Sequence, residues 1–330
     1  MPEGVTIFKP FLSPSHLSVT APSSEGALIR GFLTLWSKRS PCFCGDIMKI
    51  LIIGSNGQLG RQMQKALAMH DMDFAAYDYP DVDITDIASV EKLVQTVVPS
   101  AVVNCAAYTN VDQAETDAEN AYRINALGPK ILAEACAPKG IELVHISTDY
   151  VFGDEPVMLN GMPRPYLEDD ACHPATVYGS TKLEGERFLQ QSEAKVYILR
   201  TAWLYGDGNN FVRTMRRLGK ENGAVRVVND QIGSPTSTVD LSEAVCSLIG
   251  TGAYGLYHAT CEGQCSWYEF AKKIFELSDM SVDMTAVTSE EFVRPAKRPA
   301  WSVLENAQLK RIGKNVFRHW EDSLKEYLGK

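Results

Sequence analysis

The fold is decided by the stretch MKILIIGSNGQLG, residues 48–60. Its apolar run from Ile50 to Ile53 is unbroken, which is typical of a strand buried on both faces of a parallel sheet. Glycines at 54, 57 and 60 follow, and the pattern over residues 58–70 predicts a helix. Glycine lets the backbone approach a pyrophosphate, and free amides at a helix N-terminus attract its charge. The spacing GxxGxxG differs from the GxGxxG fingerprint, but the strand-turn-helix context favours a dinucleotide site over a plain tight turn.

The same alternation continues along the chain. Short apolar strands are expected at 74–77, 101–104, 141–146 and 196–199, and helices at 87–98, 118–137 and 176–192. This order predicts an α/β fold, a Rossmann-like doubly wound parallel sheet that binds its ligand at the carboxyl ends of the strands.

After Gly206 the alternation loosens. We assign residues 48–207 and about 226–253 to the NAD(P)-binding domain, with a strand at 226–228 and a helix at 237–249 returning to the sheet. Residues about 208–225 and 254–330 are expected to form a smaller, discontinuous α/β substrate lobe. Within it, Ser266 and Glu269 predict the capping box of a helix that ends at Leu277.

Residues 1–47 differ from the rest of the chain. They contain five prolines and show no sustained hydrophobic period. The short apolar stretch at 27–36 follows no basic region, so a signal peptide is not expected. We expect Met48 to be the natural start, or the segment before it to be a disordered tail outside the native fold.

Composition excludes several classes of function. The chain has 330 residues with 32 Lys and Arg against 41 Asp and Glu, a net charge of −9, whereas nucleic-acid binding needs clustered basic side chains. No run of 18 apolar residues occurs, so no membrane span is predicted. The eight cysteines lack the paired spacing of a zinc site, which predicts no metal and reduced thiols in a cytoplasmic protein. Twofold pairs are the commonest oligomers, so a homodimer is the default expectation.

Two residues give conflicting evidence about the cofactor. Asp78 follows the second predicted strand, where an acid accepts a hydrogen bond from the adenosine ribose and favours NADH. Arg61 follows the glycine turn and could meet the 2′-phosphate of NADPH. The choice between NADH and NADPH therefore stays open. Asp83, in the next turn, either faces the adenine or is a surface carboxylate.

Tyr178 and Lys182 lie four residues apart, and so share one face of the predicted helix. A nearby ammonium lowers the pKa of a phenol, which would make Tyr178 a useful acid–base group. Ser147, Thr148 and Asp149 end the preceding strand, where a hydroxyl can bind a substrate carbonyl. The alternatives are a surface pair on an amphipathic helix and plain capping of the strand end.

Together these residues resemble the extended short-chain dehydrogenase/reductase family over residues 48–330. The resemblance rests on several long motifs in the expected order, which is more specific than any one of them. They are residues 54–60, 104–112 (NCAAYTNVD), 147–153 (STDYVFG), 178–182 (YGSTK), 200–206 (RTAWLYG), 230–236 (DQIGSPT) and 298–304 (RPAWSVL).

The resemblance implies NAD(P)H-dependent reduction of the C4 keto group of dTDP-4-dehydro-L-rhamnose to dTDP-L-rhamnose, a precursor of cell-surface polysaccharide. By position, Thr148 would orient the keto oxygen, Tyr178 would donate the proton, and Lys182 would bind the nicotinamide ribose and tune Tyr178. The cofactor, NADPH or NADH, is expected to contact Gly54, Asn56, Gly57, Gln58, Leu59, Gly60, Arg61, Asp78, Asp83, Ala106, Ala107, Tyr178 and Lys182. The nucleotide-sugar substrate is expected to contact Asp149, Tyr150, Trp203, Gln231 and Arg298.

Local departures separate this chain from other members of the family. Nucleotide-sugar dehydratases carry a glutamate where this chain has Tyr150, so carbonyl reduction is favoured over elimination of water. Epimerases usually lack the acid at Asp149. Glu305 stands where an Asp or Asn is more typical, and no interface metal ligands can be assigned. Asn125 is either the asparagine of the family's proton relay or a brace for its helix.

Two other functions stay open. The first is reduction of a different nucleotide keto-sugar by the same mechanism, because the loops that choose the sugar are the least readable part of the sequence. The second is a non-catalytic regulatory subunit similar to the β subunit of methionine adenosyltransferase, because fold does not fix function.

Overall fold

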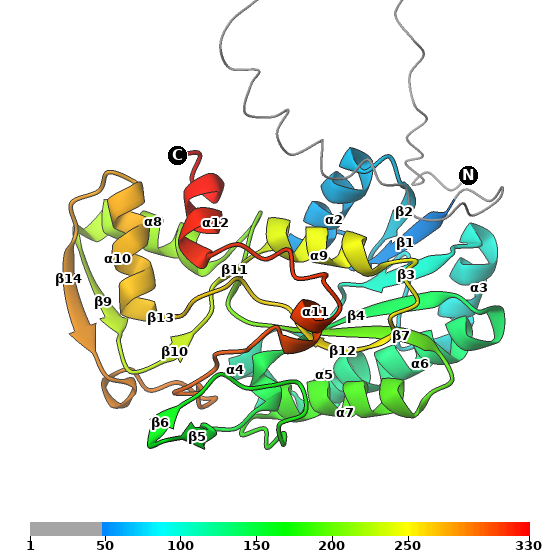
Figure 1. Cartoon of the computed structure of the whole chain (residues 1–330), viewed down its shortest axis with the longest axis horizontal. Helices are drawn as coiled ribbons and strands as arrows, with labels where there is room; N and C mark the ends of the chain where they lie inside the picture. The colour runs from blue at the N-terminus through cyan, green and yellow to red at the C-terminus, as the bar shows by residue number, and fades with distance from the viewer. Residues whose placement is uncertain (1–47) are drawn as a thin grey trace, which may run out of the picture. The chain divides into compact units, whose positions relative to one another are not determined.

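A six-stranded parallel sheet forms the centre of the structure, a computed structural model that describes residues 48–330 (Figure 1). The expectations for residues 1–47 lie outside the described residues. The strand order is β12-β7-β4-β3-β1-β2, and every neighbouring pair is parallel. The strands are β1 (Lys49–Ile53), β2 (Asp73–Tyr77), β3 (Ala101–Asn104), β4 (Glu142–Thr148), β7 (Lys195–Thr201) and β12 (Gly255–His258). The predicted Rossmann-like α/β fold is confirmed.

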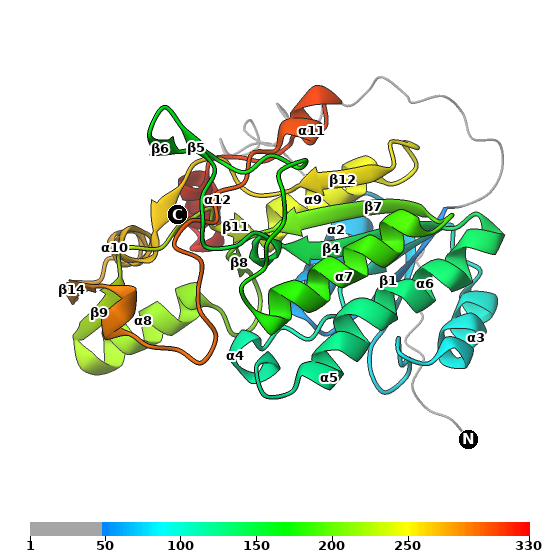
Figure 2. The same ribbon diagram turned by 90° about the horizontal axis from the view of Figure 1, so that it is seen from below.

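Helices cover both faces of this sheet (Figure 2). On β1, Ile50 and Ile52 pack in the cluster formed with α2 (Gln58–Met69) and α9 (Thr238–Leu248). The alternate residues Leu51 and Ile53 pack in the cluster formed with α3 (Ile87–Val97), α6 (Gly128–Cys136) and α7 (Val177–Gln191). Because both faces are buried, the strand is apolar at every position from 50 to 53.

The helix predicted over 118–137 is interrupted in its middle. It comprises α5 (Ala118–Tyr122), a π-helical turn at Arg123–Leu127, α6 and a 3₁₀ turn at Ala137–Lys139. In the π-helical turn the Gly128 amide bonds to the Arg123 carbonyl, five residues back. Pro129 follows and has no N–H to offer the Asn125 carbonyl, which explains the local widening.

Two expectations about the second half of the chain are wrong. The predicted strand at 226–228 belongs to β9 (Ala224–Val228), which pairs with β14 (Asp283–Val287) in a separate two-stranded sheet. Val225 and Val227 are buried while Arg226 is exposed, because this ribbon packs on one face only, against α8 (Phe211–Asn222) and α10 (Trp267–Leu277). The sixth strand of the main sheet is instead β12, which lies in the range assigned to the substrate lobe.

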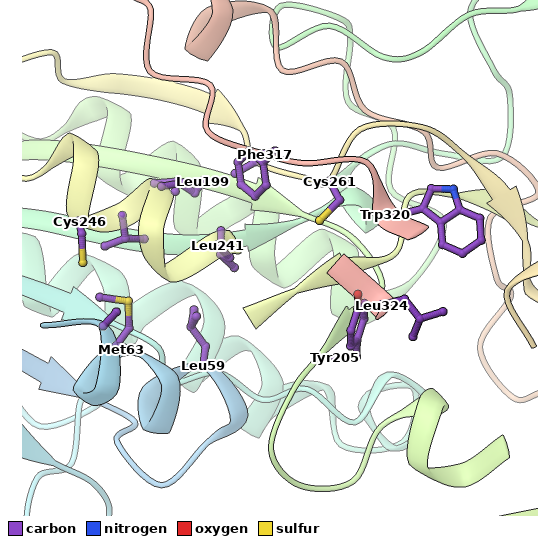
Figure 3. Close-up of a cluster of buried hydrophobic side chains, with 14 of the residues drawn as sticks. Leu59, Met63, Leu199, Tyr205, Leu241, Cys246, Cys261, Phe317, Trp320 and Leu324 are labelled. Atoms are coloured by element: carbon purple, nitrogen blue, oxygen red, sulfur yellow. The ribbon is translucent and has the colours of Figure 1, made fainter. Parts of the chain in front are cut away.

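The C-terminal segment completes the larger hydrophobic core (Figure 3). Phe317, Trp320 and Leu324 join a buried cluster that also holds Leu241 of α9 and Tyr205. The predicted capping box of α10 is present, since the Ser266 and Glu269 side chains bond to each other's backbone amides. The remaining elements are α4 (Val111–Ala114), α11 (Ala307–Arg311), α12 (Trp320–Tyr327), β5 (Met158–Leu159), β6 (Met162–Pro163), β8 (Leu204–Tyr205), β10 (Ile232–Gly233), β11 (Thr236–Ser237), β13 (Cys265–Ser266) and 3₁₀ turns at Asp149–Val151 and Ser289–Glu291. Within residues 48–330, no helix has the length and apolar character needed to cross a bilayer.

Candidate active site

A cavity of about 710 Å³ lies at the carboxyl ends of β1, β2, β3, β4 and β7. The chain leaves β1 toward β2 on one side and returns to β3 on the other, and α/β sheets bind ligands at such a switch point. Most of the predicted site residues line the cavity: Gly54, Gly57, Gln58, Leu59, Asp78, Asp83, Ala106, Ala107, Thr148, Asp149, Tyr150, Tyr178, Lys182 and Trp203. Five do not: Asn56, Gly60, Arg61, Gln231 and Arg298.

The glycine turn brings backbone against backbone at one end of the cavity. Gly54 has φ +79°, and a Cβ there would lie 2.5 Å from the Ala106 nitrogen, so only glycine fits. The N-cap of α2 is Gly57, which offers no side-chain acceptor. The first amides of the helix are therefore left for an anion.

Asp78 is fixed beside this turn. One carboxylate oxygen accepts from the Asn56 amide at 2.7 Å, and the other accepts from the Tyr79 amide at 2.8 Å. Asp83 also lines the cavity, but one of its oxygens accepts from both the amide and the hydroxyl of Thr85, at 2.8 Å each. Asp78 and Asp83 therefore place two carboxylates at the part of the cavity where the sequence predicts that the adenosine binds.

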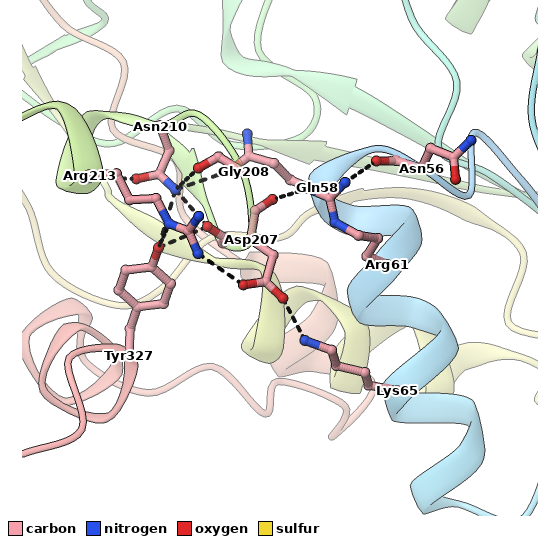
Figure 4. Close-up of polar contacts among 10 residues, drawn as sticks. Asn56, Gln58, Arg61, Lys65, Asp207, Gly208, Asn210, Arg213 and Tyr327 are labelled. Carbon is pink, nitrogen blue, oxygen red and sulfur yellow. Dashed lines mark hydrogen bonds and ion pairs between the residues drawn. The ribbon is translucent and has the colours of Figure 1, made fainter.

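Arg61 does not line the cavity. Figure 4 shows its side chain beside Asn56 and Asp207. Its guanidinium donates to the backbone carbonyls of Asn56 and Asp207. Both NH₂ groups are thus engaged in tying α2 to the loop before α8. The prediction that Arg61 meets a 2′-phosphate is not supported by this position.

Tyr178 lies one residue into α7, where Thr176 caps the helix by accepting from the Gly179 amide at 3.0 Å. The Tyr178 ring meets Tyr150 edge to face, with ring centres 5.5 Å apart. Burial raises the pKa of the phenol to about 12, and a hydrogen bond with Thr148 opposes this only in part. The predicted lowering of the Tyr178 pKa is therefore wrong for this structure.

The position of Lys182 explains that difference. Its ammonium nitrogen donates to the Ile146 carbonyl at 2.6 Å and lies 3.1 Å from His145 Nε2. Among the described hydrogen bonds, none joins Lys182 to the Tyr178 hydroxyl. Burial lowers the pKa of Lys182 to about 8.

The end of β4 provides the opposite wall. Thr148 donates its hydroxyl to one oxygen of Asp149 at 2.9 Å and accepts from the Tyr150 amide, so it also caps the strand end. The other Asp149 oxygen is buried with no hydrogen-bond partner among the described residues, and the same holds for the Thr201 hydroxyl. Both side chains line the cavity. Burial raises the pKa of Asp149 to about 6.

The neighbouring polar residues have structural contacts. Ser147 donates to Glu186, which forms a buried ion pair with Arg200 at 2.7 Å. Asn125 bonds to the backbone of Tyr108 and to Thr181, and these contacts brace its π-helical turn.

The residues predicted for the sugar side divide into two groups. Trp203 lines the cavity with φ +48° and stacks on Trp267 with ring centres 3.6 Å apart. Such strained backbone clusters at functional sites. Gln231 instead donates to Ser289 at 2.9 Å, and Arg298 donates to Asp112 at 2.9 Å. The structure therefore brings Trp203, but not these two, into the cavity.

Sequence reasoning missed Thr201, and it missed the pair His145 and Asn104 behind Lys182. Thr201 ends β7 directly opposite Thr148 in register, so the rule that selected Thr148 could have selected it too. His145 lies within an apolar strand and Asn104 at the end of another, and no spacing rule connects them. Within residues 48–330, no group of three or more His, Cys, Asp or Glu is arranged to hold a metal ion.

The chain is similar to proteins of known name. A family described as RmlD substrate binding domain matches residues 48–330. The crystal structure of a dTDP-4-dehydrorhamnose reductase from Clostridium acetobutylicum ATCC 824 is 50% identical with a TM-score of 0.82, over 86% of this chain and 99% of that one. A dTDP-4-dehydrorhamnose reductase from Bacillus anthracis str. Ames, solved in complex with NADP, is 43% identical with a TM-score of 0.81, over 86% and 99%. A probable dTDP-4,6-dihydroxy-2-methyloxan-3-one 4-ketoreductase from Streptomyces antibioticus is 41% identical over 285 residues, 84% of this chain and 94% of that protein.

Proposed function

The chain belongs to the RmlD substrate binding domain family, and on this premise we propose that it reduces the C4 keto group of dTDP-4-dehydro-L-rhamnose to give dTDP-L-rhamnose. It is an NAD(P)H-dependent oxidoreductase. The observation that carries the proposal is one cavity lined by the Tyr178 phenol, the strand-end hydroxyl of Thr148 and two buried oxygens that have no hydrogen-bond partner within residues 48–330.

The residues present fit a dinucleotide. The Gly54 turn leaves no room for a side chain, and the N-terminal amides of α2 have no side-chain cap. Asp78 is assigned to the adenosine ribose and Lys182 to the nicotinamide ribose. When bound, the nicotinamide supplies the hydride that reduces the carbonyl carbon.

Tyr178 is assigned as the proton donor. Because burial raises its pKa to about 12, the phenol keeps its proton at neutral pH and can give it to the oxygen at C4 as negative charge develops. The Thr148 hydroxyl now donates to Asp149, so it must rotate to donate to the substrate carbonyl. Proton donation of this kind contributes about 10²- to 10⁴-fold in rate.

Asp149 and Thr201 are assigned to the hydroxyl groups of the sugar. A buried polar atom without a partner costs about 1–3 kcal/mol, and a ligand hydroxyl that bonds to it removes that cost. The Asp149 oxygen accepts a hydrogen bond, whereas the Thr201 hydroxyl can donate or accept. The pair is therefore suited to two neighbouring hydroxyls of a pyranose ring.

Reduction of a different dTDP keto-sugar is the second candidate. The Streptomyces antibioticus relative carries a name with another keto-sugar at a similar level of identity. Tyr150 and Trp203, at the sugar side of the cavity, are the residues that we expect to distinguish the two substrates.

The test is the loss of reduced-nicotinamide absorbance with dTDP-4-dehydro-L-rhamnose, with NADH and NADPH in parallel. We expect Tyr178→Phe to lower kcat by about 10²- to 10⁴-fold while cofactor affinity stays close to that of wild type. Tyr254→Phe is the matched control, because Tyr254 bonds to Glu142 and does not line the cavity. Cofactor binding without turnover of this sugar would contradict the assignment and leave another keto-sugar or a non-catalytic role.

A further inference from the structure

Lys182 lies at the end of a chain of buried hydrogen-bonding groups. Lys182, His145 and Asn104 are each 1% exposed. The Lys182 nitrogen is 3.1 Å from His145 Nε2, and His145 Nδ1 is 3.1 Å from the Asn104 side-chain nitrogen. β3 and β4 place Asn104 and His145 side by side in register.

The orientation of the Asn104 amide determines which nitrogen of His145 carries the proton. The Asn104 oxygen accepts from the Ala106 amide at 3.1 Å, so its NH₂ group faces His145. An NH₂ group only donates, and His145 Nδ1 must therefore accept. A neutral imidazole has one N–H, which is then on Nε2 and points at Lys182.

This tautomer disfavours an ammonium at Lys182. An ammonium has three donors and no acceptor, so it would oppose the Nε2–H of His145 with another N–H. A neutral amine has a lone pair that accepts from Nε2–H, while one of its own hydrogens is donated to the Ile146 carbonyl at 2.6 Å. With the neutral amine, each of these contacts pairs a donor with an acceptor.

We propose that Asn104 and His145 are positioning residues that hold Lys182 as a neutral amine in the free protein. Lys182 then becomes an ammonium only by taking a proton from solvent. If the bound cofactor interacts with the ammonium form of Lys182, cofactor binding is accompanied by uptake of that proton. The inference rests on the proposed function only in assigning Lys182 to the cofactor site.

The charges around Lys182 agree with this inference. Burial lowers the pKa of Lys182 to about 8 and lowers that of His145 well below its usual value. Glu186, one turn further along α7, favours the ammonium but is already paired with Arg200. Tyr178, one turn earlier, stays neutral because burial raises its pKa. The His145 tautomer acts in the same direction as burial, so both favour the neutral amine of Lys182.

Wild-type protein tests the first step directly. Nitrogen NMR of labelled histidine distinguishes the two neutral tautomers, and we expect His145 to carry its proton on Nε2 from about pH 6 to 8. Carbon NMR of the lysine Cε gives the Lys182 midpoint. A proton on Nδ1, or a cationic ring, would overturn the inference whatever reaction the protein catalyses.

Asn104→Asp tests the second step with little change in volume. An aspartate accepts from Nδ1–H, so the tautomer reverses, Nε2 accepts, and the Lys182 midpoint should rise by about one unit or more, a tenfold change in the equilibrium constant. The added negative charge by itself also raises the Lys182 midpoint. The same Asn104→Asp change is therefore made in a His145→Gln background, where the side chain has no tautomers to exchange. An equal rise in both backgrounds would refute the coupling.

Isothermal titration supplies a third readout. In buffers of different ionisation enthalpy, binding of NADPH or NADH to wild type near pH 8 should take up a fraction of a proton per site, and binding to Asn104→Asp should take up less. Binding with no proton uptake in wild type would overturn the coupling while leaving the reductase assignment untouched. Absence of binding in wild type would instead contradict the proposed function.

Discussion

Asp149→Asn should make the protein more stable at neutral pH while impairing its activity. Asp149 is 3% exposed, and one of its oxygens has no partner among the described residues. Burial raises its pKa from 3.8 to about 6. The ionised form is therefore the unfavourable one in the folded protein.

The magnitude follows from the size of that rise. Two pKa units correspond to about 3 kcal/mol of lost stability once the carboxyl is ionised in both states. Below about pH 4 the carboxyl is protonated in both states and this cost is absent; it grows as pH rises and is complete above about pH 7. Asparagine removes the charge and keeps one oxygen to accept from the Thr148 hydroxyl, but it buries an NH₂ group in place of the unpartnered oxygen, which costs about 1 kcal/mol. The net gain at about pH 7.5 is then about 2 kcal/mol.

Urea unfolding at about pH 4.5 and 7.5 measures this change. The advantage of Asp149→Asn over wild type should grow by about 2 kcal/mol between these values. Asp170→Asn is the control of opposite sign, because a hydrogen bond from Arg164 lowers the pKa of Asp170 and its carboxylate is stabilising. A difference between Asp149→Asn and wild type that does not vary with pH would refute the assignment of a buried, unsatisfied carboxylate.

Three further changes test other parts of the site. Asp78→Ser should raise kcat/KM with NADPH relative to NADH by about tenfold, because it removes a fixed carboxylate from the adenosine end of the cavity. Steady-state kinetics with both cofactors measures this ratio, and an unchanged ratio argues against the role assigned to Asp78. Gly60→Ala should weaken cofactor binding at least about tenfold, because a Cβ there would lie 2.1 Å from the Gly54 carbonyl oxygen and displace the turn at a cost of about 1–3 kcal/mol. A fluorescence titration that gives the variant the same cofactor affinity as wild type would contradict this expectation. Arg200→Met should lower the free energy of unfolding by about 3–5 kcal/mol, because it leaves the Glu186 carboxylate buried without the guanidinium that balances its charge. Denaturant curves should show most of that loss recovered when Glu186→Gln is added to Arg200→Met.

The sequence predicted the half of the fold that obeys one simple rule. Strands β1, β3, β4 and β7 of the central sheet are buried on both faces, so each contains an apolar run that can be recognised without its neighbours. β9 carries the alternating pattern of a strand buried on one face, with Val225 and Val227 inside and Arg226 outside. That alternation contained the evidence that β9 does not return to the main sheet. β12 is only four residues long, and its place beside β7 depends on a pairing far along the chain.

The site divides in a similar way. Residues at strand ends and helix starts were predicted because local sequence determines where strands and helices end, and Thr148, Asp149 and Tyr178 all line the cavity. The contact of Arg61 with the carbonyl of Asp207, 146 residues away, could not be predicted from the local sequence. The Lys182 contacts were missed for the same reason, since they involve side chains on two other strands. Long-range polar contacts have no period in the sequence, so pattern rules do not detect them.

Burial shifts three ionisable groups of the cavity toward their neutral forms. It raises the pKa of Asp149 and of Tyr178 and lowers that of Lys182, so each is shifted toward its neutral form. In a site of this kind the transferable proton stays on Tyr178 at neutral pH. Reduction of a carbonyl needs a proton donor, whereas the reverse oxidation needs a base, so the free protein is poised for reduction. A ligand that brings negative charge into the cavity favours proton uptake there. Lys182 is the one basic side chain among the described lining residues, and burial lowers its pKa to about 8, so it is placed to accept that proton.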